Sequence, residues 1–94
     1  MISARSPIPL GRILATPGAL AACQASGDVP ADFLRRHECQ DWGNVGADDW
    51  ARNDEALRVG NRIVSSYRLK NGETIWIITE ADRSVTTLLL PDEY

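Results

Sequence analysis

The dipeptide Asn71-Gly72 constrains the fold of this sequence more than any other feature, because Asn-Gly between two strand-like segments favours the tight turn of a β-hairpin. Residues 62–69 before it alternate in the two-residue period of a strand with two distinct faces. Residues 74–80 after it contain the unbroken apolar run 75–78, which is typical of a central strand covered on both faces. The sequence therefore predicts a hairpin whose second strand is enclosed.

A third strand is expected at 85–90, after the turn-forming segment 81–84 and before Pro91. With the hairpin it makes a three-stranded antiparallel meander over about 61–90. Residues 10–15 are a candidate for a short extra edge strand. An uncovered sheet edge can pair with another chain, so a homodimer stays open as an alternative.

The first half of the chain carries signals for three helices. Thr16-Pro17 supplies an N-cap and a proline at the first helical position, and Gly27 suits a left-handed cap at the end of that helix. Asp28-Val29-Pro30 opens a second short helix whose last turn is basic. A third helix is expected at about 47–59. Its apolar arc would hold Ala47, Trp50, Ala51 and Leu57.

These patterns predict an α+β fold in which two or three short helices cover the meander. At 94 residues the chain has the length of one domain, so we expect a single domain over 1–94, with 1–9 as an extended or frayed arm. No apolar run approaches the roughly 20 residues of a membrane helix, and the first residues lack the apolar core of a secretory signal. We therefore expect a cytoplasmic protein whose two cysteines stay reduced.

Charge is unevenly distributed along the chain. Residues 38–55 hold six acidic side chains against the single base Arg52, a net of −5, while the whole chain carries −3. This balance argues against general nucleic-acid binding, which needs a dominant basic face. One explanation is that the acids lie in the solvated first turns of a helix, since acids are favoured at helix N-termini. The alternative is that they form a surface that binds a basic partner. The residues predicted to bind a partner, with the second turn included, are Asp41, Trp42, Asp48, Asp49, Glu55, Glu80, Asp82 and Arg83.

The second turn is also the best candidate for chemistry. Glu80 and Asp82 are close enough in sequence for general acid–base catalysis by a pair of carboxylates, and Arg83 could bind an anion. The same residue types are common in turns for purely structural reasons. No base or second carboxylate cluster completes a site, so no catalytic residue is predicted.

Three side chains of the middle segment need an explanation of their own. Asn53 and Asp54 fall on or beside the apolar arc of the third helix, where an unpaired polar group costs about 1–3 kcal/mol. We expect them to bond the backbone or an arginine of the sheet such as Arg62 or Arg83; the alternative is that they line a pocket. Trp42 lies in a glycine-flanked loop, and we expect it to fold into the core rather than act as an exposed contact.

Metal and cofactor sites are not expected. His37 and Cys39 could both reach one metal ion, but a structural zinc site needs four ligands and no second Cys/His pair exists. The glycines do not form the spacing of a phosphate-binding loop.

Several stretches resemble a family of short, plasmid-related proteins of bacterial mobile elements. These are Asp41-Trp42-Gly43, residues 53–57, residues 62–67 and, above all, residues 75–91. The likeness spans roughly residues 8 to 94. It implies a genetic context, that of plasmids and integrative elements, and no particular chemistry.

That context favours a non-enzymatic interaction protein of mobile elements. Its sharpest form is an inhibitor of a host nucleic-acid defence complex, of anti-CRISPR or anti-restriction type, that binds a host protein through its acidic surface. One alternative is a small enzyme or ligand-binding module that uses the second turn together with Asn53 and Asp54. Another is a DNA-associated accessory factor that uses the basic residues Arg12, Arg35 and Arg36.

Overall fold

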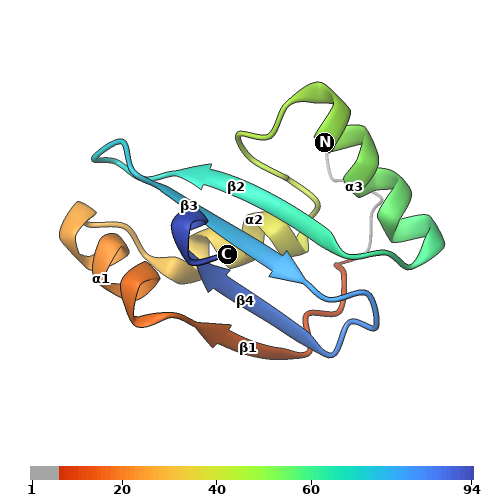
Figure 1. Cartoon of the computed structure of the whole chain (residues 1–94), viewed down its shortest axis with the longest axis horizontal. Helices are drawn as coiled ribbons and strands as arrows, with labels where there is room; N and C mark the ends of the chain where they lie inside the picture. The colour runs from red at the N-terminus through yellow and green to blue at the C-terminus, as the bar shows by residue number, and fades with distance from the viewer. Residues whose placement is uncertain (1–6) are drawn as a thin grey trace.

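The sheet of the computed structural model, which describes residues 7–94, has four strands in the order β1-β4-β3-β2 (Figure 1). In chain order the elements are β1 Arg12–Ala15, α1 Pro17–Ser26, α2 Pro30–Glu38, α3 Ala47–Val59, β2 Ile63–Arg68, β3 Thr74–Thr79, β4 Val85–Leu89 and the 3-10 turn η1 Pro91–Glu93. The α+β class expected from the sequence is confirmed.

Strands β2, β3 and β4 are antiparallel neighbours, as predicted. Ile63 lies opposite Thr79 across β2 and β3, and Trp76 lies opposite Leu89 across β3 and β4. Gly72 in the first turn has a φ of 91°, a left-handed conformation that glycine adopts without strain. The period-2 pattern and the Asn-Gly turn therefore gave the correct strands and the correct order.

Strand β1 confirms the extra edge strand and changes the character of the sheet. It runs parallel to β4, with Arg12 opposite Val85, so the sheet is mixed instead of the three-stranded antiparallel sheet predicted. Gly11 allows this pairing: its φ is 65°, and a Cβ at this position would lie 2.3 Å from the carbonyl oxygen of Ser84. The chain can therefore enter β1 beside the second turn only with glycine at this position.

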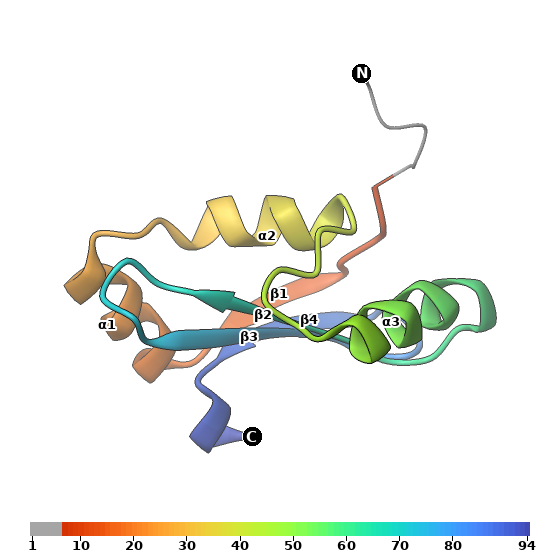
Figure 2. The same cartoon turned by 90° about the horizontal axis from the view of Figure 1, so that it is seen from above.

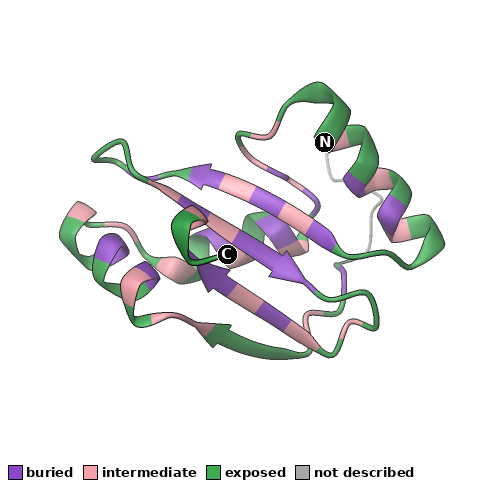
Figure 3. Ribbon diagram, viewed as in Figure 1, coloured by how far each residue is buried: buried purple, intermediate pink, exposed green. Residues whose placement is uncertain are grey.

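One face of the sheet holds the main core and is covered by α1 and α2 (Figure 2). Alternate residues of β2, β3 and β4 point to this side, and they are buried (Figure 3). The core cluster comprises Ala19, Ala22, Cys23, Phe33, Tyr67, Leu69, Ile75, Ile77 and Leu88. Helix α1 has the predicted caps, since the N–H of Ala19 donates to Thr16 Oγ1 (3.0 Å) and Gly27 is left-handed.

Helix α3 lies beside the β2 edge, and the arc predicted to face the core is wrong in part (Figure 1). Ala47 and Ala51 are exposed, while Asn53 and Ala56 are buried. The helix is turned this way because Asn53 bonds the backbone of Val64 in β2. Around this contact a second, smaller core forms from Ile8, Trp42, Ala56 and Ile63, with Leu10, Val45, Trp50 and Leu57 packed against it.

The predicted arm 1–9 falls mostly outside the described residues. Of its last three residues, Ile8 is buried and its N–H donates to the carbonyl of Glu38 at 3.0 Å. This part of the arm therefore packs against the domain.

The second face of the sheet is less well covered than the sequence predicted for the central strand. Ile78 of β3 is only 4% exposed, but Trp76 on the same face is half-buried. The segment from Leu90 to Tyr94 lies on this side (Figure 2). We call this second side of the sheet the open face.

A candidate binding groove between α3 and the open face

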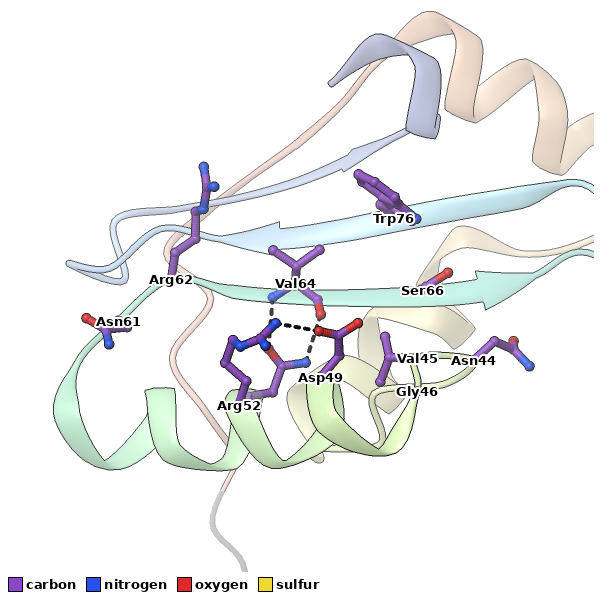
Figure 4. A pocket seen from close by; sticks show the side chains of 11 residues that line it. Asn44, Val45, Gly46, Asp49, Arg52, Asn61, Arg62, Val64, Ser66 and Trp76 are labelled. Atoms are coloured by element: carbon purple, nitrogen blue, oxygen red, sulfur yellow. Dashed lines mark hydrogen bonds and ion pairs between the residues drawn. The ribbon is translucent and has the colours of Figure 1, made fainter.

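A groove of about 730 Å³ lies in the corner between α3 and the open face (Figure 4). Its helix side is formed by Asp49, Arg52 and Asn53, and its strand side by residues of β2 and β3. The loop before α3 closes one end. The remaining lining residues are Asn44, Val45, Gly46, Asn61, Arg62, Val64, Ser66 and Trp76.

The strand side follows from the two-residue period of β2. Ile63, Ser65 and Tyr67 are buried on the covered face, so Val64 and Ser66 point to the open face. Trp76 pairs with Ser66 across β2 and β3 and therefore lies on the same side. An indole ring, a valine and a serine hydroxyl thus line the strand side.

The side-chain amide of Asn53 joins the helix side of the groove to the backbone of β2. Asn53 Nδ2 donates to the carbonyl of Val64 at 2.7 Å, and the N–H of Val64 donates to Asn53 Oδ1 at 3.2 Å. This amide supplies one donor and one acceptor, as a neighbouring peptide group would. The expectation that Asn53 bonds the backbone is confirmed, and Asn53 also borders the groove.

The rest of the β2 edge is occupied in the same way. The N–H of Ser66 donates to the carbonyl of Trp42 at 3.2 Å, and the N–H of Asn44 donates to the carbonyl of Ser66 at 2.6 Å. Asn44 Oδ1 also accepts from the N–H of Arg68 at 2.9 Å. These bonds hold the loop and the helix on the strand, and they thereby form the walls of the groove.

The groove carries more positive than negative charge. Arg52 forms an ion pair with Asp49 (Nη1 to Oδ1, 2.6 Å), and because both side chains are well exposed this pair stabilises the fold by no more than about 1 kcal/mol. Arg62 donates to the hydroxyl of Tyr94 and lies over its ring, 5.3 Å from the centroid. Tyr94 in turn meets Trp76 edge-on, with 5.7 Å between ring centroids. Of the described residues 7–94, two arginines and one acid border the groove, although the net charge of the chain is −3.

Two acids of the segment 38–55 are paired with arginines from outside it. Arg36 Nε contacts Asp41 Oδ2 at 2.7 Å, and this hydrogen bond holds the pKa of Asp41 below its usual value. Arg58 pairs with Glu55 at 2.5 Å, and Asp48 lies in the first turn of α3 beside Asp49. Arg36 and Arg58 lie outside the segment, so its net of −5 overstates the charge of the surface it forms.

Trp42 folds into the core. Its ring is fully buried, and its indole Nε1 donates to Asp54 Oδ1 at 3.0 Å. This contact explains the polar Asp54 on the inner side of α3. Trp42 is one of the residues predicted to bind a partner. In the structure it is buried and supports α3 through its contact with Asp54.

The second turn is separate from the groove. Asp82 Oδ1 accepts from the N–H of Ser84 (3.0 Å) and from its hydroxyl (2.6 Å), and these bonds lower the pKa of Asp82. Arg83 reaches back to cap α3, donating to the carbonyl of Asn61 at 2.7 Å and to that of Ala56 at 3.1 Å. Glu80 is exposed. None of Glu80, Asp82 and Arg83 lines the groove, so the structure does not bring this turn together with Asn53 at one site.

His37 is the centre of a buried polar network on the covered face. Thr86 donates to the carbonyl of Leu10 (2.7 Å), so it accepts from Thr79 (2.7 Å), and Thr79 in turn accepts from His37 Nε2 (2.8 Å). His37 Nδ1 is then the acceptor of the Ser65 hydroxyl at 2.6 Å. Burial lowers the pKa of His37 to about 4, with the charge of Arg83 as a smaller cause.

This network bears on the metal alternative. Both ring nitrogens of His37 are engaged, while Cys39 is exposed. Among residues 7–94, no group of three or more His, Cys, Asp or Glu side chains is arranged to hold a metal ion.

The basic residues of the accessory-factor alternative do not form one patch with free charges. Arg36 is paired with Asp41, and Arg35 lies 3.7 Å from Asp32. Arg12 lies in β1, on another element.

Only part of the groove follows from sequence patterns. Arg52, Arg62 and Trp76 are not among the residues predicted to bind a partner. For Trp76 the reason is that the apolar run 75–78 is typical of a strand covered on both faces. The two-residue period of the strand is the sequence pattern that indicates this surface. It places positions 62, 64, 66 and 68 on one face, which carries two arginines and a serine.

Comparisons with known proteins return no match from family models, from curated proteins or from solved structures. Within the described part of the chain, none of the helices has the length and apolarity that a membrane crossing requires.

Proposed function

We propose that this protein acts by binding another protein, without catalysing a reaction, and that the groove beside α3 is its contact surface. The observation that carries the proposal is the half-buried Trp76, which lines one groove together with two arginines. Tryptophan, tyrosine and arginine are the residues that most often dominate binding energy at protein interfaces. Exposed acids on the outer turns of α3, Asp48 among them, would surround this centre and steer a partner with a basic rim.

In its specific form, the proposal is that the protein belongs to a mobile genetic element and acts in the cytoplasm. There it inhibits a host nucleic-acid defence complex of anti-CRISPR or anti-restriction type. The resemblance of residues 75–91 to plasmid-related proteins supports this context. The acidic net charge of −3 supports a protein contact over direct nucleic-acid binding.

Affinity capture with the full chain tests the proposal. Tagged wild type and Trp76→Ala are used to capture partners from a host lysate, and Leu20→Ala serves as the control because Leu20 is an exposed apolar residue of α1, away from the groove. We expect a partner that the wild type and the control retain and that Trp76→Ala loses. A plasmid-interference assay with the same variants then tests the inhibitory role. Equal capture by all three proteins would reject the groove as the contact surface.

A further inference from the structure

The segment after β4 turns back across the open face and ends beside the groove. Glu93 joins this segment to the start of α1, because Glu93 Oε1 accepts hydrogen bonds from Thr16 Oγ1 and from the N–H of Leu90, both at 2.7 Å. Tyr94 then lies between Trp76 and Arg62, in contact with both. Two groove residues are thus already engaged with an aromatic side chain of the same chain.

The contact made by Tyr94 is suited to exchange. Tyr94 is 63% exposed, so its ring removes little apolar surface from water. The contact also occupies Arg62, whose guanidinium donates to the Tyr94 hydroxyl. Removal of Tyr94 would leave this guanidinium without that acceptor and available to a carboxylate, which arginine binds strongly and in a defined geometry.

We propose that Trp76 and Arg62 form a subsite for an aromatic side chain, which Tyr94 fills in the free protein and which a tyrosine of the partner fills in the complex. This inference rests on the proposed function. The partner segment is extended and acidic: its tyrosine replaces Tyr94, and its carboxylates meet Arg62 and Arg52.

Two observations favour an acidic peptide with a tyrosine as the occupant. The first is charge complementarity, because Arg52 and Arg62 border a groove in which Asp49 is the one acid among the described lining residues. The second is the chain's own segment Asp92-Glu93-Tyr94, which already places an acidic run and a tyrosine at this end of the open face. A nucleic-acid base could also stack on Trp76, but the side chain that occupies this place in the structure is a tyrosine, which favours a peptide as the occupant.

The experiment is an NMR titration of the full chain with end-blocked peptides. Leu-Pro-Asp-Glu-Tyr, copied from residues 90–94, is added to wild type and to Tyr94→Ala, and Leu-Pro-Asp-Glu-Ala is the matched control. We expect the tyrosine peptide to shift the indole N–H of Trp76 and the amides of Val64 and Ser66. It should bind Tyr94→Ala about tenfold more tightly than the alanine peptide does. It should bind wild type about threefold more weakly than Tyr94→Ala, because Tyr94 competes for the subsite.

Three results would overturn the inference. They are equal binding of the two peptides, absence of shifts around Trp76 in Tyr94→Ala, and stronger shifts with a short single-stranded oligonucleotide than with the peptide. Tyr94→Phe provides a check on the subsite, since it keeps the ring but loses the hydroxyl that Arg62 binds, and its peptide affinity should lie between those of the other two proteins. Failure of the peptides, with capture of a partner still dependent on Trp76, would reject the subsite and leave the proposed function standing.

Discussion

The two faces of the sheet differ in how far their side chains are buried. On the covered face even the polar side chains are buried and bonded to one another, as His37, Ser65 and Thr79 show. On the open face Val64, Ser66 and Trp76 are only partly covered, and they border a groove. The difference indicates that stability depends mainly on one face, which leaves the other free to bind.

The largest effect should come from one substitution made on each face. Leu88, 1% exposed in the main core, and Leu14, 42% exposed on the open side of β1, are both strand residues. Leu88→Ala should lower the free energy of unfolding by about 2–5 kcal/mol, because it leaves a cavity. Leu14→Ala should cost less than about 1 kcal/mol. Urea unfolding of both variants measures the contrast, and similar losses would refute it.

The next effect is pH dependence that originates from the covered face. The pKa of His37 is about 4 in the folded chain and about 6.5 when unfolded, so only the unfolded state takes up a proton as the pH falls between these values. The free energy of unfolding should therefore be highest above pH 6.5, and the contribution of His37 should lower it by roughly 3 kcal/mol by pH 4.

Unfolding curves measured from pH 7.5 to 4.5 test this dependence. His37→Gln can keep a donor and an acceptor, and it should flatten the profile. A wild-type profile that is already flat over this range would contradict the burial of a neutral His37.

A smaller effect is expected where α3 joins β2. Asn53→Ala removes both hydrogen bonds to Val64 and should cost about 1–3 kcal/mol. Asn44→Ala, at an exposed position, should cost less, about 0.5–1.5 kcal/mol, because it removes the bond to the N–H of Arg68. Amide exchange at Val64 should accelerate in Asn53→Ala and stay unchanged in Asn44→Ala. Unchanged exchange in both would show that the amide of Asn53 does not hold the helix.

The contrast between the faces also explains what the sequence could predict. The caps at Thr16 and Gly27 and the turn at Asn71-Gly72 act through neighbouring residues, so those elements followed from local patterns. The parallel pairing of β1 with β4 joins residues far apart in the chain, and no local pattern encodes it.

The candidate site was harder to predict because it depends on tertiary partners. Asn53 was expected to bond the backbone, but its actual partner, Val64, sets the rotation of α3 and thereby the groove. The acidic segment was predicted as a charged surface, whereas Arg36 and Arg58 from outside it pair with two of its acids. Trp76 was predicted to be enclosed because an apolar run does not reveal which face of a sheet stays open.

The smallest effect on stability, and the most direct test of the groove, comes from a matched pair of arginines. Arg52 and Arg35 have side chains 74% and 72% exposed, and each pairs with an aspartate three residues earlier in its helix. Arg52 lines the groove, whereas Arg35 lies on α2 and does not line it. Substituting either by glutamate should change the free energy of unfolding by less than about 1 kcal/mol.

Binding of the captured partner by these two variants is the measurement that tests the central claim. We expect Arg52→Glu to weaken binding by about tenfold or more, and Arg35→Glu to bind as wild type does. Equal affinities for the two variants, or a loss confined to Arg35→Glu, would show that the partner does not contact the groove beside α3.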